Sequence, residues 1–179
     1  MLEYIYKLNL PNIEEIILPD KYKEIFAPTS EKIKFSHQKP NSFLKKEHLT
    51  FKHYRWDSSL LFYKNNGAIG DLHSDLPKAS WAINYITAGK GIMRYYDNNV
   101  IGPGTMIPDK LGNFRLAWDM PTVGPAKVYT MTRGVYLVRV DIPHIVTGYD
   151  NRYALSIRSL ADQEESWATV VNNFCEYFI

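Results

Sequence analysis

The chain has 179 residues, of which 45% are hydrophobic and 22% are charged, and its formal net charge is +2. This length is enough for a full hydrophobic core, and we expect a single domain over residues 1–179. The composition excludes extended disorder, and the small net charge gives no strong signal of nucleic-acid binding.

Cysteine content and hydropathy bear on the cellular compartment. Cys175 is the only cysteine in the sequence, which excludes an intrachain disulfide and a thiolate cluster. The first residues lack a basic segment followed by an apolar run, and no apolar stretch reaches the length of a membrane span. We therefore expect no membrane partner and a cytoplasmic location, with the oligomeric state left open.

Strand patterns dominate the chain in sequence order. Apolar residues alternate from Leu2 to Leu8, and a helix is expected over Pro11 to Ile17 or over Pro19 to Phe26. The Ala88-Gly89-Lys90-Gly91 segment is interpreted as a hairpin-like connection between two strands. Four segments rich in apolar, aromatic or β-branched residues are predicted as strands: Trp81 to Thr87, Ile92 to Tyr96, Val135 to Val140 and Arg152 to Arg158.

The segment from Asp97 to Arg133 contains several Gly and Pro residues and is expected to be a long loop. Binding residues are often carried by loops at the mouth of a rigid β-fold. We therefore expect this segment to form a lid, with Trp118 or Arg115 in contact with substrate.

The C-terminus changes to a helical period. Asp162 is expected to cap a helix, because Glu165 follows three residues later in a capping-box pattern. Cys175 is expected to be buried on this helix. The expected apolar face consists of Trp167, Val170, Val171, Phe174, Cys175 and Phe178. Many short strands with helices at both ends predict a mainly-β jelly roll with flanking helices.

The segment His73-Ser74-Asp75 holds a histidine and a carboxylate two residues apart. In extended backbone these two side chains point to the same side, so both are able to bind one ion. The same spacing is typical of a turn in which Asp75 accepts local hydrogen bonds. Gly67 and Gly70 precede the segment and allow a sharp bend or a close backbone approach.

A second histidine and two arginines lie further along the chain. His144 follows the predicted strand Val135 to Val140 and is expected at the mouth of the jelly roll. Arg152 and Arg158 are six residues apart, so both lie on one face of a strand. An inward-facing arginine is costly unless paired, and a dicarboxylic acid would pair it through two parallel hydrogen bonds. Internal ion pairs and a solvated outer face are the alternatives.

These residues resemble the Fe(II)/2-oxoglutarate-dependent oxygenase superfamily. Its pattern is His-x-Asp, a long interval, a second His and then Arg or Lys, which here is His73-Ser74-Asp75, His144 and Arg152. The run of Tyr63, Gly67, His73 and Asp75 is similar to the segment that leads to the metal motif in the prolyl-hydroxylase branch. The run from Arg152 to Arg158 is similar to a strand of the alkylation-repair dioxygenases. The resemblance covers about half of the chain, and the gap between His144 and Arg152 is short for the superfamily.

The resemblance implies a double-stranded β-helix, which is a cupin-like jelly roll. It implies that Fe(II) is bound by His73, Asp75 and His144. It also implies an activity: a dioxygenase that uses Fe(II), 2-oxoglutarate and O2 to hydroxylate a small molecule or a peptidyl residue, with succinate and CO2 as co-products.

Four residues are expected to serve the co-substrate on the same resemblance. Arg152 would hold the distal carboxylate of 2-oxoglutarate, and Arg158 would either replace it in that role or support Asp75. Tyr63 and Asn84 would add hydrogen bonds, the latter on the ground of its place in a strand.

Two other functions are consistent with the same residues. A non-catalytic cupin-like module would bind a sugar or a small acid, and four aromatic residues near the expected mouth favour it: Trp81, Tyr95, Tyr96 and Trp118. A zinc hydrolase would use the same ligand types with an open water position. It would also need a general base near the metal, and the sequence nominates none.

Overall fold

The structure is a computed structural model that describes residues 2–10, 41–51, 54–65, 70–75, 79–108, 114–159 and 165–179, with the backbone alone between residues 41 and 65. In these ranges the helical elements are α3 (Asn98–Ile101), α4 (Trp167–Phe174) and a 3-10 turn (Cys175–Tyr177). The strands are β1 (Ile5–Leu8), β2 (Asn41–Phe51), β3 (Tyr54–Asn65), β4 (Leu72–Ser74), β5 (Trp81–Tyr95), β6 (Thr105–Pro108), β7 (Phe114–Trp118), β8 (Lys127–Met131), β9 (Gly134–Arg139) and β10 (His144–Ser159).

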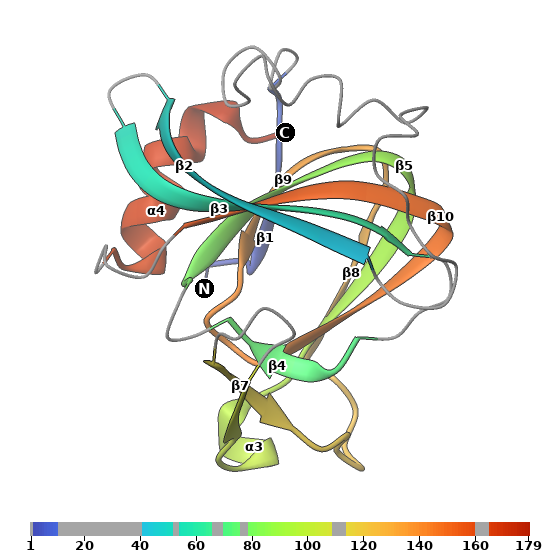
Figure 1. Cartoon of the computed structure of the whole chain (residues 1–179). Helices are drawn as coiled ribbons and strands as arrows, with labels where there is room; N and C mark the ends of the chain where they lie inside the picture. Colours follow the sequence, from blue (N-terminus) through green and yellow to red (C-terminus); the bar gives the residue numbers. More distant parts are fainter. Residues whose placement is uncertain are drawn as a thin grey trace.

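Two long strands, β5 and β10, run through both layers of the sheet (Figure 1). Residues 154–158 of β10 pair with β3 on one side and with residues 82–86 of β5 on the other, and β9 and β1 continue this first layer. Residues 144–149 of β10 pair with residues 90–95 of β5, while β4, β7 and β6 extend one edge of this second layer and β8 the other. All of these pairings are antiparallel. The expected mainly-β, cupin-like jelly roll with a C-terminal helix is confirmed.

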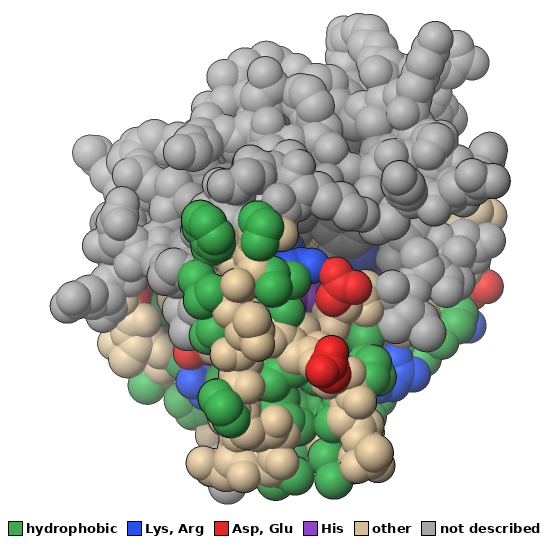
Figure 2. All heavy atoms as spheres, turned by 60° about the horizontal axis from the view of Figure 1, so that its bottom comes forward, with side chains coloured by type: hydrophobic (Ala, Val, Ile, Leu, Met, Phe, Trp, Pro, Cys, Tyr) green, Lys and Arg blue, Asp and Glu red, His purple; other side chains and the backbone are tan. Residues whose placement is uncertain are grey.

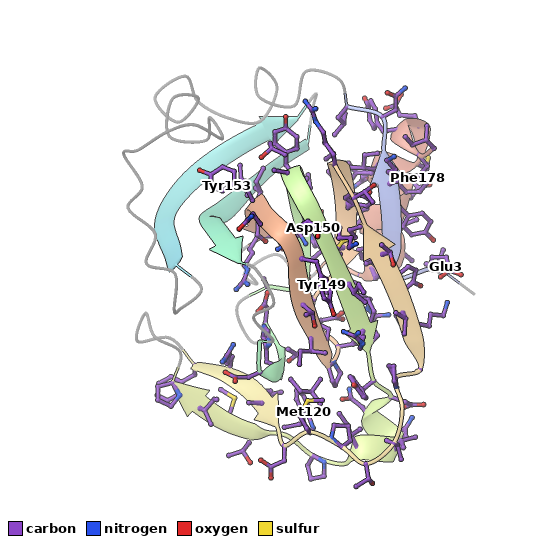
Figure 3. All side chains as sticks on the ribbon, turned by 90° about the vertical axis from the view of Figure 1, so that its right-hand side faces the viewer. Glu3, Met120, Tyr149, Asp150, Tyr153 and Phe178 are labelled. Carbon is purple, nitrogen blue, oxygen red and sulfur yellow. The ribbon has the colours of Figure 1, made fainter. Side chains whose placement is uncertain are left out.

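The two long strands bend where they pass from one layer to the other. Gly89 has φ +67°, and a Cβ at this position would lie 2.5 Å from the carbonyl oxygen of Tyr149, so only glycine fits here. On the neighbouring strand β10, Asp150 and Asn151 have φ of 55° and 53°. Figure 3 shows Tyr149, Asp150 and Tyr153 in succession along this part of β10.

The expected hairpin at Ala88–Gly91 is therefore wrong. The chain continues in the same direction through Gly89, because residues on both sides of the bend pair with β10. One bent strand stands where two strands joined by a turn were predicted. The expected long loop from Asp97 to Arg133 is also wrong, because α3, β6, β7 and β8 lie within it.

Two large apolar clusters lie one on each side of the first layer. Tyr153, Leu155 and Ile157 of β10 pack in a cluster with Val170 and Phe174 of α4, which covers the outer face (Figure 1). A second cluster lies between the layers and includes Ala82, Ile86, Met93, Tyr95 and Ala154. Even-numbered residues of β10 therefore face the space between the layers.

The C-terminal helix begins later than the sequence predicts. Ser166 is its N-cap and accepts a hydrogen bond from the backbone N–H of Thr169 at 3.1 Å, so the expected start at Asp162 is wrong. The α-helix ends at Phe174, and the chain tightens into a 3-10 turn. This change of period leaves Cys175 exposed, which contradicts the expected burial. The helices expected between residues 11 and 26 lie outside the described residues.

No helix among the described residues is long and apolar enough to cross a membrane.

Candidate metal centre

Two strands of the second layer bring together three side chains that could hold a metal ion. His73 lies on β4, Asp75 directly follows that strand, and His144 begins β10 opposite His73 in the ladder. One ligand atom from each of the three lies within 4.8 Å of the others. Asp75 and His144 are buried, while the side chain of His73 is 13% exposed. The adjacent pair His73 and Asp75 and the distant His144 thus form one cluster between the layers.

Backbone carbonyls fix the orientation of both imidazole rings. The Nδ1 of His73 lies 2.7 Å from the carbonyl oxygen of Asp71, and the Nδ1 of His144 lies 2.9 Å from that of Ile142. A carbonyl oxygen accepts only from N–H, so Nδ1 carries the proton in each ring. The lone pair is then on Nε2, and the Nε2 of His73 faces Asp75 Oδ1 at 3.4 Å. Such fixing of the tautomer by the other ring nitrogen is usual for metal-binding histidines.

The carboxylate of Asp75 is held in its charged form. Burial by itself would raise the pKa of Asp75, but the nearby Arg158 guanidinium holds that pKa well below its usual value. The Nη1 of Arg158 lies 3.2 Å from Oδ1. The other oxygen, Oδ2, is buried and has no hydrogen-bond partner within the described part of the chain. A buried charged oxygen of this kind fits a cation ligand.

The ring of His144 is kept neutral. Burial lowers the pKa of His144 to about 3. A neutral imidazole is the form that binds a metal ion. Two Nε2 lone pairs and one carboxylate oxygen therefore fit a divalent transition-metal ion.

Arg152 and Arg158 occupy the same face of β10, as their even separation predicts. The side chain of Arg152 is fully buried, and a Cβ on Gly91 would lie 2.8 Å from its Nε. Glycine at position 91 therefore leaves the space in which the Arg152 side chain lies. Of the alternatives left open by the sequence, an internal ion pair is the observed one for Arg158, since it contacts Asp75.

Asn84 also lies on the inner face of the first layer. It is buried and stands opposite Ser156 in the ladder between β5 and β10. Its Oδ1 has no hydrogen-bond partner among the residues that the structure describes. The backbone of Tyr63 pairs with Ala154, but its side chain, like Gly67, is outside the described residues. Polar groups thus face the inter-layer space near the cluster.

The expected role of Trp118 does not agree with its position. Trp118 stands opposite Leu72, and its ring lies in a small cluster with Leu72 on the other face of the second layer. Its indole N–H donates to the carbonyl of Gly102 at 2.9 Å. Trp118 therefore faces away from the metal centre.

Other aromatic residues thought to lie near the mouth also belong to the core. Trp81 packs against Phe174 under α4, and Tyr96 belongs to the cluster of Leu72. Among them Tyr95 does lie beside the centre, with its ring centroid 5.9 Å from that of His144.

Two residues of the site were missed by sequence reasoning. Asp71 and Ile142 each lie two residues before a histidine and provide the carbonyl that orients its ring. The shared spacing of two residues is the signal that would have found them. Figure 2 shows histidine surface at the centre of one face of the molecule, with basic and acidic side chains beside it.

Comparisons with known proteins give no family for this chain. No protein family model matches the sequence, and no curated protein matches it. Among solved structures, hydroquinone 1,2-dioxygenase from Sphingomonas sp. TTNP3 matches 57% of this chain and 59% of its own, at 13% identity and a TM-score of 0.38. The hydroquinone 1,2-dioxygenase PnpCD matches 68% of this chain and 66% of its own, at 12% identity and a TM-score of 0.40.

A third solved structure, oxalate decarboxylase from Lactobacillus farciminis, matches 79% of this chain and 40% of its own, at 13% identity and a TM-score of 0.37. The chain therefore spans about three fifths to two thirds of the two dioxygenase chains that it matches. The chain's own fold and side chains define its class as a cupin-like jelly roll with a candidate metal centre of two histidines and one carboxylate.

Proposed function

We propose that this chain is an Fe(II)- and 2-oxoglutarate-dependent dioxygenase that hydroxylates a small molecule or a peptidyl residue and releases succinate and CO2. The observation that carries the proposal is the convergence of two Nε2 lone pairs and a buried, unpartnered carboxylate oxygen between the two layers. Two histidines and one carboxylate on one side of a ferrous ion leave coordination positions open for other ligands.

The metal residues would have simple tasks. His73, Asp75 and His144 would hold the ion, and the carbonyls of Asp71 and Ile142 would keep both rings in the binding tautomer. When bound, the ferrous ion would supply the activation of dioxygen that is coupled to decarboxylation of 2-oxoglutarate. No side chain of the protein needs to act as a general acid or base.

Arg152 is the better candidate for the distal carboxylate of 2-oxoglutarate. Arg158 contacts the Asp75 carboxylate through its Nη1 at 3.2 Å, which fits the role of supporting that residue. Arg152 lies on the same face of β10, is fully buried, and has its side chain accommodated by Gly91. A guanidinium grips a carboxylate through two parallel hydrogen bonds, and burial strengthens that interaction. Asn84 would add a hydrogen bond from the neighbouring strand β5.

The surroundings of the centre would keep water away from the bound co-substrate. Met93, Tyr95, Met131 and Ala154 belong to one buried cluster between the layers. The hydroxyl of Tyr95 donates to the carbonyl of Arg139 at 2.8 Å, so its hydrogen is already used within the protein. Apolar walls of this kind shield a reactive site from bulk solvent.

Anaerobic spectroscopy tests the proposal directly. Fe(II) and 2-oxoglutarate added together without oxygen should give a weak visible charge-transfer band, and admission of air should produce succinate. Arg152→Gln should raise the half-saturating concentration of 2-oxoglutarate by about tenfold or more, because it loses a charge-assisted hydrogen-bond pair. Arg133→Gln, at an exposed position in the turn before β9, is the matched control. A missing band together with no succinate would refute the proposal.

The binding-module alternative loses its main support. Three of the four aromatic residues that favoured it lie in packed clusters away from the metal centre: Trp81, Tyr96 and Trp118.

A further inference from the structure

Arg115 lies on the same face of the second layer as the metal centre. In the ladder between β4 and β7, Ala117 stands opposite His73, and Arg115 is two residues from Ala117 on the same face. Its Nη2 contacts the carboxylate of Asp71 at 2.6 Å. Asp71 lies on the far side of His73 along the strand direction, so the Arg115 side chain extends past the small Ala117. The guanidinium therefore lies at the rim of the centre, beside a metal-binding ring.

The contact between Arg115 and Asp71 is incomplete. It joins one nitrogen to one oxygen, and the Nε of Arg115 is buried without a hydrogen-bond partner in the part of the chain that is described. Arg139 offers a comparison within the same protein, because its Nε and Nη2 bind the two oxygens of Asp141 at 2.7 and 3.0 Å. Arg115 thus uses only one of the two guanidinium nitrogens that would pair with a carboxylate.

Asp71 is also a partner that is easily displaced. Its side chain is 72% exposed, whereas that of Arg115 is 23% exposed. Exposed ion pairs contribute little to stability, so moving the Asp71 carboxylate into water costs little. The backbone carbonyl of Asp71, which orients His73, does not depend on where its side chain points.

We propose that Arg115 binds the carboxylate of a small organic acid, with Asp71 as its placeholder when no acid is present. A carboxylate approaching from the rim would take both Nε and one Nη, which is the geometry that Arg139 shows with Asp141. The inference rests on the proposed function in one respect, since it takes the bound acid to be the substrate. The oxidised carbon would then lie between this carboxylate and the metal ion.

Nuclear magnetic resonance of the arginine Nε–H groups tests the proposal in the full-length, metal-free protein. The probe is benzoate, with benzamide as its uncharged counterpart. The Arg115 signal is assigned by its loss in Arg115→Lys. Benzoate should shift this signal and benzamide should not. Asp71→Asn should tighten benzoate binding by about threefold, because the competing carboxylate is removed.

Lysine keeps the charge but loses the fork, so Arg115→Lys should weaken benzoate binding, followed on the neighbouring backbone signals, by about tenfold. Arg133→Lys should leave binding unchanged. An Arg115 signal that ignores benzoate, or an unchanged affinity in Asp71→Asn, would overturn the inference. The measurement involves neither iron nor turnover, so its result can be interpreted even if the protein has no 2-oxoglutarate-dependent activity. If the enzyme is active but benzoate does not shift the Arg115 signal, this inference alone is refuted.

Discussion

Arg158 and a bound metal ion would act on the same carboxylate. Without metal, the Arg158 guanidinium is a cation in contact with the buried Asp75, at 3.2 Å. A divalent ion held by His73, Asp75 and His144 would be a second cation beside the same carboxylate. At the scale of single residues, Arg158 is therefore best described as a positioning residue that keeps Asp75 charged.

Arg158→Gln should destabilise the metal-free protein by about 3 kcal/mol, because it leaves a buried carboxylate without its cation. A metal ion would replace that cation, so Fe(II) added without oxygen should restore more stability to this variant than to the parent. Urea unfolding with and without metal measures both quantities. Arg133→Gln serves as the control. Equal metal-induced stabilisation of variant and parent would contradict this role of Arg158.

The buried ring of His144 gives the metal-free protein a pH-dependent stability. The pKa of His144 is about 3 in the folded state and near its ordinary value of 6.5 in the unfolded chain. Between these values the unfolded chain binds a proton that the folded protein does not. Stability is therefore fully present above about pH 6.5 and falls with decreasing pH, by up to about 1.4 kcal/mol per pH unit.

Urea unfolding between pH 5 and pH 8 should show this slope. The window stays about one unit above the pKa of ordinary carboxyl groups, so their titration contributes little. His144→Gln should flatten the curve, since glutamine does not titrate. A slope that persists unchanged in the variant would assign the effect to other groups.

At the scale of elements, the bend of β5 depends on one glycine. Gly89→Ala should destabilise the protein by about 2–4 kcal/mol, because it adds a positive-φ penalty and a clash with the carbonyl of Tyr149 at 2.5 Å. Gly102 is the matched control. It also has positive φ, at +76°, but a Cβ there would meet nothing within 4 Å, so Gly102→Ala should cost only the backbone strain, about 1–3 kcal/mol, with no clash added. Equal losses in the two variants would show that packing at the bend is unimportant.

The same bend shows where element prediction from sequence stops. Several strand segments, in β1, β5, β9 and the second half of β10, were predicted, because period-two alternation is a local property. Whether Ala88–Gly91 turns back or bends onward was not, because glycine serves both conformations. The outcome depends on a partner 60 residues away, Tyr149, whose carbonyl fills the space beside Gly89. The start of α4 at Trp167 was missed for a similar reason, since both Asp162 and Ser166 are acceptable caps.

At the scale of the whole molecule, the sequence predicted the jelly roll and the candidate residues but not their arrangement. The spacing of Arg152 and Arg158 placed both on one face, as observed, because parity along a strand is independent of tertiary structure. Which arginine contacts Asp75 depends on the register between β4 and β10, which no local pattern encodes. The pairing of Arg115 with Asp71 is likewise a consequence of β7 lying beside β4.

The bend of β10 restricts how this protein is able to change its length. Between the pairs Tyr149–Lys90 and Ala154–Ile86, β10 has four residues and β5 has three, so β10 carries one extra residue at the bend. His144 and Arg158, on opposite sides of this bend, both lie beside Asp75. Insertion or deletion of a single residue here would turn every side chain beyond the bend outward, including both arginines. Viable length variants should therefore differ at this position by pairs of residues.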